Sequence, residues 1–527
     1  MGNKKLQVWL PLLFSIVMIA GMFFGYRLNG GGKGKGFFKT SKPTSLQEAV
    51  DLIRLKYVDP VNLDSLQTGA IQEMMKELDP HSVYFPPVEL KEVNEELAGN
   101  FEGIGVEFNI FNDTVNVVYV MPAGPSEKAG LQIGDKIIKA DDSSLTAPNI
   151  SSTKIREHIR GQKGSVAVLQ VLRNGQLKTI NVTRESIPVF SVDAAYFIND
   201  TTGYIKLNKF TETSYEEFMK ALEDMQKKGL KSLIFDLRGN GGGYMNEAVD
   251  IADEFLDQDK LIVYTEGVNS KKREYRCKRP GLFETGKLCL LVDELSASAS
   301  EVLAGALQDW CRATIIGRRT FGKGLVQEQY DLTDGSAIRL TVARYYTPLG
   351  RSIQRPYDKG KKVYMDEIWE RYSNGEALYA DSNKIQTGKL FPTPCGDTLY
   401  GSGGIMPNIF VAIDTATFPY GVDRLLANGS FNNFVYLYYL RNRNQIDKYT
   451  NVPAYVKGLN QDQLWKDYVS YIGHDAVYLD SINAQQKETL QRRLEAYLSR
   501  FRWRNNGFYE VLNKEDQVIN KALEKIK

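Results

Sequence analysis

The segment from Leu288 to Trp310 reads LCLLVDELSASASEVLAGALQDW. Its apolar start is typical of a buried strand, and the amphipathic run from Ala299 predicts a helix after a turn of small residues. Ser296, Ser298 and Ser300 lie in or beside that turn. Because the free N–H groups and the dipole of a helix N-terminus favour a developing negative charge, one of these serines could be a nucleophile. The common alternative for such a serine is an N-cap role.

Strand-like and helical patterns alternate around this segment, from about residue 195 to about residue 413. Apolar runs such as KSLIFDLR and ATIIG are typical of strands, whereas SYEEFMKALEDMQKKG and YMNEAVDIADEF have the spacing of amphipathic helices. This alternation predicts an α/β core. The polar and aromatic stretch 357–400 interrupts the alternation, and we interpret it as an insertion.

Other patterns flank this core. Residues 44–98 have apolar positions at three- and four-residue spacing, which predicts helices, and Asp79-Pro80 is expected to end the second of them. Residues 103–184 contain short β runs and two short helical pieces, which indicates a compact module. Residues 416–527 again have a helical, aromatic-rich pattern.

The composition argues against several classes of protein. The protein has 527 residues, 43% of them hydrophobic, and a formal net charge of +2. This hydrophobic fraction is typical of globular domains. The near-zero net charge lacks the positive field that binding to nucleic acid requires. With 3 histidines and 4 cysteines without CxxC spacing, we expect no metal site, and a Ser-His-Asp enzyme would have few candidates for its base. The cysteine spacing leaves three disulfide pairings open.

The N-terminus carries an uncharged apolar stretch from Leu6 to Tyr26, whose length matches the hydrocarbon core of a membrane. We interpret residues 1–27 as an uncleaved signal anchor, because no clean small-x-small cleavage site follows; a cleaved signal peptide is the alternative. The glycine-rich residues 28–43 are expected to form a flexible linker. Basic residues on both sides of the span leave its orientation open.

A second segment with candidate catalytic residues is ATIIGRRTFGKGLVQEQYDL (313–332), which places Lys323 between two glycines. Small neighbours allow the lysine to be enclosed, and burial lowers the pKa of an amine because the charged form is desolvated. A neutral amine can take a proton from a serine hydroxyl in place of a histidine. If LVQEQY is a strand, Gln327 could orient that amine. The alternative is a surface lysine in a glycine turn.

A third segment, SLIFDLRGNGGGYMNEAV (232–249), leads from a strand through the glycine-rich turn 239–243 into a helix. The backbone N–H groups of such a turn can bind an anion or an oxyanion. A dinucleotide loop is the alternative, but the GxGxxG pattern fails because residue 244 is tyrosine. Phosphate binding would also leave the serine and lysine segments without a role.

Together, these strings resemble the carboxy-terminal processing (tail-specific) serine proteases. TPLGRSIQ and LDPHSVYF belong to the same resemblance, which covers nearly all of residues 44–415. It implies a Ser/Lys dyad with the lysine 25 residues after the serine, a spacing that pairs Ser298 with Lys323. It also implies Gln327 as an assisting residue. The implied oxyanion donors are the backbone N–H groups of Ala299 and of a glycine in the turn, with Gly243 the best match and Gly242 the next.

The resemblance further implies a PDZ domain at residues 99–186. This domain would be inserted before a crotonase/Clp-protease-like α/β protease core at 187–415, with helical regions at 44–98 and 416–527. The string GIGV resembles the carboxylate-binding loop of the PDZ domain, whose N–H groups capture the C-terminus of a polypeptide beside a groove for β-strand addition. Its residues are Gly103, Ile104, Gly105 and Val106.

The function predicted on this basis is a serine endopeptidase of extracytoplasmic (periplasmic) proteins that needs no metal or cofactor. Its PDZ domain would capture protein or peptide C-terminal tails, and the core would cut near them. We expect the catalytic body in the periplasm, anchored in the inner membrane or secreted if the signal is cleaved, and the protein could form homo-oligomers. The alternative is a catalytically silent, membrane-anchored PDZ scaffold. A ligand carrier on the same fold is disfavoured because the Ser/Lys/Gln set is complete.

Overall fold

The computed structural model describes residues 4–30, 44–111, 113–379, 389–401, 403–414, 425, 427–473, 479 and 482–527. Within 4–30, side chains are described at residue 9 and at residues 11–24. The protein divides into two compact units, Met1–Ile71 and Gln72–Lys527.

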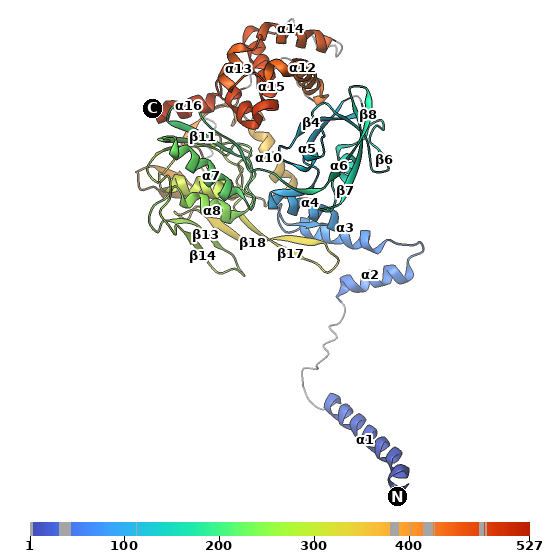
Figure 1. The fold of residues 1–527 in the computed structure, drawn as a ribbon. Helices are drawn as coiled ribbons and strands as arrows, with labels where there is room; N and C mark the ends of the chain where they lie inside the picture. Colours follow the sequence, from blue (N-terminus) through green and yellow to red (C-terminus); the bar gives the residue numbers. More distant parts are fainter. Residues whose placement is uncertain are drawn as a thin grey trace. The chain divides into compact units, whose positions relative to one another are not determined.

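The first unit contains the helices α1 (Lys4–Gly30) and α2 (Ser45–Lys56) and the beginning of α3 (Leu63–Lys76) (Figure 1). The predicted anchor 1–27 and linker 28–43 lie partly outside the described residues, and α1 continues into the predicted linker. Within the part of the sequence that the structure describes, no helix combines the length and the apolar character needed to cross a membrane.

A six-stranded sheet lies at the centre of the second unit. Its strand order is β10-β11-β12-β15-β16-β21, and every neighbouring pair except β10–β11 is parallel. The strands are β10 (Val192–Phe197), β11 (Thr202–Leu207), β12 (Ser232–Asp236), β15 (Lys287–Val292), β16 (Thr314–Gly317) and β21 (Ile409–Phe410). Parallel strands connected through helices confirm the α/β core that the alternating pattern predicted.

Helices pack on both faces of this sheet, as the labels in Figure 1 show. Side chains along a strand alternate between its faces. Leu233 and Leu288 therefore join one apolar core with α7 (Ser214–Lys227), α8 (Met245–Asp253) and α9 (Ala299–Asp309). Ile234 and Leu291 join a second core on the other face, against α16 (Gln517–Ile526). This double cover explains why the strands read as continuous apolar runs.

A second, antiparallel sheet carries the lysine segment. Its order is β1-β18-β13-β14, and β17 pairs with β18. The strands are β1 (Val83–Phe85), β13 (Leu261–Glu266), β14 (Arg273–Arg276), β17 (Leu325–Asp331) and β18 (Ala337–Tyr346). β1 lies inside the region 44–98, for which the periodicity predicted helices. The strand exists because β18, more than 250 residues away in sequence, provides its hydrogen-bond partners.

The predicted PDZ region folds as a separate sheet with two short helices. Its order is β3-β4-β5-β7-β8, and the additional short strand β6 (Ser143–Ser144) pairs with β5. The other elements are β3 (Val106–Phe111), β4 (Thr114–Val120), α5 (Pro125–Lys128), β5 (Lys136–Ala140), α6 (Ser152–Ile159), β7 (Val166–Arg173) and β8 (Gln176–Thr183). At the two ends of this region, α4 (Pro87–Ala98) leads into β2 (Asn100–Gly103), which pairs with β9 (Glu185–Pro188). Among the described residues, β3 pairs with β4 alone, so its other edge is open for strand addition.

The predicted insertion 357–400 contains α10 (Lys361–Ser373) and the hairpin β19 (Leu390–Pro392)–β20 (Thr398–Tyr400); residues 380–388 lie outside the described residues. A disulfide joins Cys395 in this hairpin to Cys311, which follows α9. Cys277 and Cys289 are free and buried. None of the three complete pairings that the sequence left open is present, because the structure contains one disulfide, which links the insertion to the end of the helix that follows Ser298, and two free cysteines.

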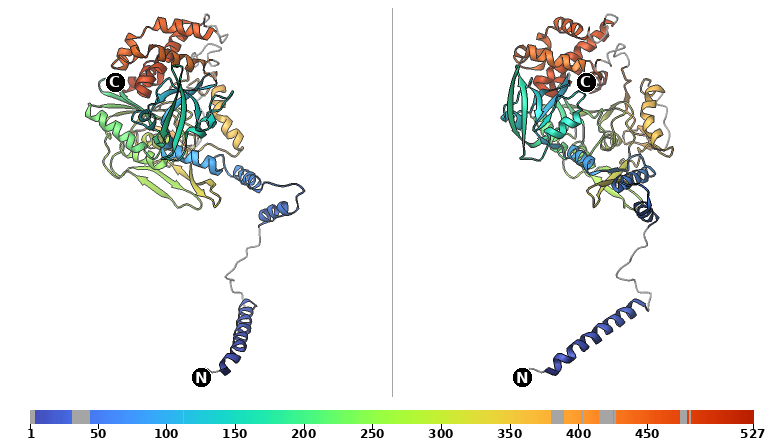
Figure 2. Two further views of the ribbon diagram at one scale, coloured as in Figure 1. Left: turned by 45° about the vertical axis from the view of Figure 1, so that its right-hand side comes forward. Right: turned by 90° about the vertical axis from the view of Figure 1, so that its right-hand side faces the viewer.

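The C-terminal helices lie next to one another (Figure 2). The core that they share is rich in aromatic side chains. They are α12 (Ser430–Ile446), α13 (Val452–Gly458), α14 (Gln461–Ile472) and α15 (Ala484–Leu512), followed by α16. This region also contacts the PDZ-like sheet, because Phe111 stacks on Tyr436 and Arg504 forms an ion pair with Glu107. The C-terminal helices therefore touch both the central sheet and the PDZ-like sheet.

Candidate active site

Two neighbouring parallel strands lead into the candidate site. β12 runs into the glycine turn 239–243, and β15 runs into the turn that holds Ser298. Since the carboxyl ends of parallel strands meet at one edge of a sheet, the two turns lie side by side. The Ala297 N–H and the Ser300 hydroxyl both donate to the carbonyl oxygen of Asn240, at 3.0 and 2.8 Å. These bonds connect the serine turn to the glycine turn.

Ser298 differs from the two other serines of its turn. Ser296 and Ser300 are fully buried, and their hydroxyls donate to the carbonyl oxygens of Leu237 and Asn240. Ser298 is partly exposed and adopts φ 55° and ψ −111° at the N-cap of α9. Such a backbone conformation costs a non-glycine residue about 1–3 kcal/mol and is concentrated at functional sites. The geometry thus favours Ser298 as the nucleophile among the three.

Glu301, in the first turn of α9, joins the serine turn to the lysine turn. It is completely buried. Its Oε2 accepts from the backbone N–H groups of Ser298 and Lys323, each at 2.9 Å. Its Oε1 accepts from the Gly322 N–H at 2.7 Å and from the Thr320 hydroxyl at 2.6 Å. Burial raises the pKa of Glu301, and these four hydrogen bonds act in the opposite direction.

Tyr345 on β18 bridges the same two turns. Its hydroxyl lies within hydrogen-bond distance of the carbonyl oxygens of Ser298, at 3.0 Å, and of Lys323. Within the described residues, no hydrogen bond joins Ser298 Oγ to Lys323 Nζ. The two backbones are thus held beside each other while the two side chains share no hydrogen bond.

Lys323 is directed by a short series of hydrogen bonds. Its Nζ donates to Gln327 Oε1 at 2.9 Å, and Gln327 Nε2 donates to the carbonyl oxygen of His81 at 2.8 Å. Burial, followed by the charge of Arg339, lowers the pKa of Lys323 from its ordinary value of 10.5 to about 8. Because of this lowered pKa, Lys323 is neutral in a substantial fraction of molecules near pH 8. The His81 ring accepts or donates a hydrogen bond at Tyr364 Oη.

One glycine of the turn packs directly against Ser298. Gly242 approaches the serine turn so closely that a Cβ atom on it would lie 2.9 Å from Ser298 Cβ and 3.1 Å from the Ala299 nitrogen. The Gly242 N–H, however, already donates to Asn240 Oδ1 at 2.9 Å. Among the described residues, the N–H groups of Ala299 and Gly243 donate no hydrogen bond. The sequence left Gly243 and Gly242 as first and second candidates for the oxyanion donor, and this difference favours Gly243 together with Ala299.

The GIGV loop lies at the start of the open-edged strand β3. Ile104 is buried, and Gly105 has φ 72°, a conformation that favours glycine. The carbonyl oxygens of Ile104 and Gly105 accept from Ser126 and from the Met121 N–H. Neither Ile104 N–H nor Gly105 N–H donates a hydrogen bond within the described residues. Gly103 ends β2 and Val106 begins β3, so the four predicted residues lead into the strand that has the open edge.

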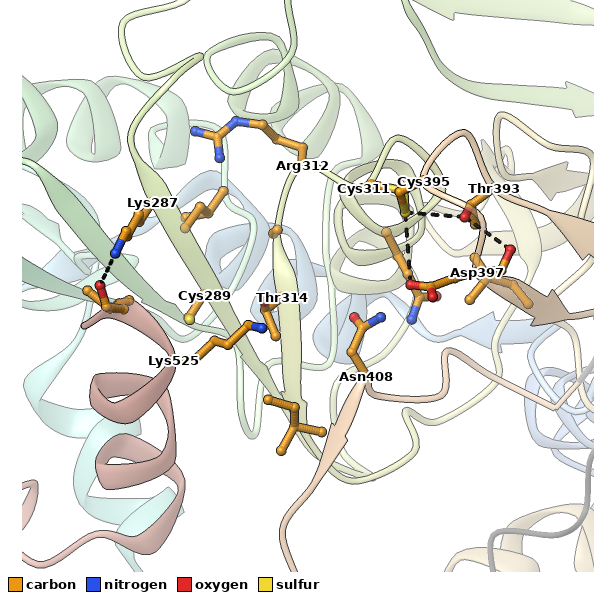
Figure 3. A pocket seen from close by; sticks show the side chains of 16 residues that line it. Lys287, Cys289, Cys311, Arg312, Thr314, Thr393, Cys395, Asp397, Asn408 and Lys525 are labelled. Carbon is orange, nitrogen blue, oxygen red and sulfur yellow. Dashed lines mark hydrogen bonds between the residues drawn. A yellow bond between two sulfur atoms is a disulfide. The ribbon is translucent and has the colours of Figure 1, made fainter.

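A cavity of about 520 Å³ lies apart from this site (Figure 3). Its lining includes Lys287 and Thr314, which begin β15 and β16, and the disulfide Cys311–Cys395. Ser298 follows the opposite, carboxyl end of β15. The cavity and the candidate active site therefore lie at opposite ends of the same strands.

Sequence reasoning missed Glu301, Tyr345 and Arg339. Glu301 had a readable signal, because Ser298-x-x-Glu301 has the spacing of a capping box, in which the glutamate side chain returns to the N-cap N–H. Tyr345 and Arg339 had none, since they reach the site through the pairing of β18 with β17 and β1.

Comparison with known proteins identifies four matched regions. Residues 201–360 match peptidase family S41, and residues 103–183 match the PDZ domain. Residues 33–87 match the activating protease CtpB N-terminal domain, and residues 422–504 match a family of unknown function.

Curated relatives share much of this sequence. It is 34% identical over 315 residues to carboxy-terminal processing protease CtpB of Bacillus subtilis, covering 59% of this protein and 65% of that one. It is 32% identical over 383 residues to carboxy-terminal processing protease CtpA of the same organism, covering 72% and 81%. Among solved structures, the photosystem II D1 C-terminal processing protease is 29% identical with a TM-score of 0.35, covering 59% of this protein and 83% of the other.

Proposed function

The protein belongs to the carboxy-terminal processing proteases of peptidase family S41 and contains a PDZ domain, and from this premise we propose that it is a serine endopeptidase with a Ser298/Lys323 dyad. The observation that carries the proposal is the double bridge between the serine and lysine turns. One carboxylate oxygen of Glu301 accepts from both backbone N–H groups, and the Tyr345 hydroxyl reaches both carbonyls. Such bridging preorganises a nucleophile and its base.

In the proposed reaction, neutral Lys323 accepts the proton of Ser298 Oγ as this oxygen attacks the scissile carbonyl carbon. Rotation of the side chains must first bring Oγ and Nζ within hydrogen-bond distance. The N–H groups of Ala299 and Gly243 then stabilise the oxyanion, and losing one such donor typically costs ~3 kcal/mol of transition-state stabilisation. The lysinium protonates the leaving amine, and water, deprotonated by Lys323, hydrolyses the acyl-enzyme.

Gln327 keeps Lys323 pointed at the serine during this cycle. Its Oε1 can accept from the amine in either protonation state, and the carbonyl of His81 fixes which end of the amide faces Lys323. We therefore assign Gln327 to orienting the base rather than to proton transfer.

The PDZ domain would deliver the substrate as a C-terminal tail. The free N–H groups of Ile104 and Gly105 suit a terminal carboxylate, and the open edge of β3 suits an added strand. A tail captured in this way can reach the core only if it is unstructured, which favours cleavage near the ends of substrate proteins.

We also propose that the catalytic body works outside the cytoplasm, with the N-terminal segment as a membrane anchor. The disulfide Cys311–Cys395 supports an oxidising compartment, since such bonds are rare in reducing cytosol. Labelling of intact cells with a thiol-free, membrane-impermeant, amine-reactive reagent tests this directly. Protection of the body in intact cells and labelling after lysis would contradict the proposal.

The dyad is tested with Ser298→Ala and Lys323→Ala, assayed on an unfolded protein with free, amidated or extended C-termini. Both variants should lose cleavage by at least about 10³-fold while still binding the free tail. An acylating electrophile should label Ser298 in the wild type only. Wild-type turnover in either variant rules out the dyad, and tight tail binding without cleavage by the wild type favours the silent scaffold. Equal cleavage of all three termini rules out tail recognition.

A further inference from the structure

Two cations are held on neighbouring glutamines of β17. Lys323 Nζ donates to Gln327 Oε1 at 2.9 Å, and Arg339 Nη2 donates to Gln329 Oε1 at 3.1 Å. Gln327 and Gln329 are two positions apart on one strand, so they lie on the same face at a rise of roughly 7 Å. The two hydrogen bonds therefore anchor an amine and a guanidinium side by side.

The position of Arg339 is set by the sheet. It lies on β18 opposite Gln329 of β17 and opposite Val83 of β1. Its guanidinium carbon lies 4.9 Å from the ring centre of Phe85. Among the described residues, no carboxylate forms an ion pair with Arg339. Its positive charge is thus held in place by a neutral amide and an aromatic ring, and no described anion neutralises it.

Other charged groups around Lys323 come from two further elements. Glu301 of α9 and Asp79, which precedes β1, both act to raise the pKa of Lys323. Their oxygens are already engaged, Glu301 by four donors and Asp79 by the N–H groups of His81 and Ser82 and by two hydroxyls. The pKa of the His81 ring is lowered to about 3, chiefly by burial, so the ring carries no charge at neutral pH. Arg339 is thus the neighbouring group whose charge opposes protonation of the amine.

Resting on the proposed role of Lys323 as the base, we propose that Arg339 is a positioning residue that acts through Lys323. Its guanidinium, held on Gln329, repels a proton on the amine and so favours the neutral base. Arginine suits this task because its own charge persists at every pH at which the enzyme works. The like-charge arrangement is the one by which a second cation activates a lysine.

The inference is tested by the pH dependence of kcat/KM for Arg339→Gln. Because the two charges are held on neighbouring glutamines of one strand and are partly exposed to solvent, removing the charge should move the lower midpoint to higher pH by roughly half a unit to one unit. This corresponds to a ~3–10-fold loss of kcat/KM at pH 7, with the alkaline plateau retained. Raising the ionic strength should move the wild-type midpoint in the same direction and leave that of the variant nearly unchanged.

Two further variants control the measurement. Arg344→Gln removes a positive charge further along β18, where Arg344 is exposed and donates to Tyr357 instead of to a glutamine of β17, and its midpoint should match the wild type. Arg339→Lys keeps the positive charge, so its midpoint should lie closer to that of the wild type than to that of Arg339→Gln. Thermal unfolding of all variants confirms that they are folded.

Three results would overturn the inference. The first is an unchanged midpoint in Arg339→Gln. The second is a loss of kcat/KM in Arg339→Gln that is equal at every pH and confined to KM, which would make Arg339 a substrate-binding residue. The third is an Arg339→Lys midpoint as alkaline as that of Arg339→Gln. Each of these leaves the proposed dyad intact as long as Lys323→Ala is inactive. Activity in Lys323→Ala would instead remove the proposed function itself.

Discussion

Replacing Lys323 with methionine should make the protein more stable at neutral pH although it abolishes activity. In the folded protein, the pKa of Lys323 is lowered from 10.5 to about 8, first by burial and then by Arg339. The unfolded polypeptide therefore binds a proton at this residue more tightly than the folded protein does. Below pH 8 the lysine is protonated in both states, and the folded protein carries the full penalty of holding that charge.

The size of this penalty follows from the difference in pKa. At ~1.4 kcal/mol per pH unit, lowering the pKa from 10.5 to about 8 corresponds to roughly 3 kcal/mol. Methionine has a similar length and no charge, so it removes the penalty. It also removes the hydrogen bond from Nζ to Gln327, which is worth about 1 kcal/mol. The net gain expected below pH 8 is about 2 kcal/mol.

The pH dependence gives this prediction its signature. Between pH 8 and 10.5, the wild type loses its proton in the folded state first, so its stability rises with pH and the gain from methionine disappears. Hydrogen exchange of the amides in β17 and α9 reports the unfolding free energy of the core itself. Ser298→Ala is the matched control, because we expect it to be equally inactive without a change of charge. A Lys323→Met protein that is less stable than Ser298→Ala at pH 7, or a difference that is constant up to pH 10.5, would refute the reasoning.

Three other substitutions test the rest of the site. Gly243→Ala should abolish turnover and lower thermal stability, because its Cβ would lie 2.0 Å from a carbonyl oxygen. Gly239 also has a positive φ but has open space around it, so Gly239→Ala should lower the free energy of unfolding by only ~1–2 kcal/mol. Equal melting temperatures of the two variants would contradict this. Glu301→Gln should lower kcat by at least ~10²-fold and stability by about 2–4 kcal/mol, since an amide cannot accept from all four donors; unchanged kcat would show that Glu301 does not align the dyad. Asp516→Asn should leave kcat within about twofold while speeding hydrogen exchange in α16, because it keeps the N-cap of α16 and removes the ion pair between Asp516 and Arg238 at 2.8 Å; unchanged exchange would show that this ion pair does not stabilise α16.

Local sequence patterns predicted the parts of the fold that depend on local interactions. The central strands and helices follow from runs of one periodicity, and the glycine turn and the serine turn follow from residue types that only turns accommodate. The choice of Ser298 among three serines rested on the resemblance and its spacing to Lys323. The structure adds a physical reason, since the hydroxyls of Ser296 and Ser300 are buried and already bonded to backbone carbonyls.

What the sequence could not predict depends on contacts between distant segments. β1 lies in a region of helical periodicity and becomes a strand because β18 pairs with it. The same pairing places Arg339 near Lys323, and no local pattern encodes such a register. The disulfide Cys311–Cys395 closes a gap of 84 residues across an insertion of irregular pattern. The sequence pattern alone does not show that the N–H of Gly242, but not that of Gly243, is bonded to Asn240.

Two features of this site lower the stability of the protein, the positive φ of Ser298 and the desolvated Lys323. Both are held in place by contacts with the buried helix α9. Every residue of α9 is buried, so the helix cannot shift without exposing apolar surface on all sides. At its N-terminus, Glu301 holds the two reacting turns together. At its C-terminus, Asp309 pairs with Arg351 in a fully buried ion pair at 2.6 Å, and Cys311 is tied to the insertion. Breaking such a pair leaves an uncompensated buried charge, which typically costs about 3–5 kcal/mol. Because both ends are fixed in this way, the positive φ of Ser298 and the desolvated Lys323 cannot relax by moving the helix. The strain and the lowered pKa are therefore maintained by packing rather than by substrate, and the backbones of the serine and lysine turns stay side by side in the free protein.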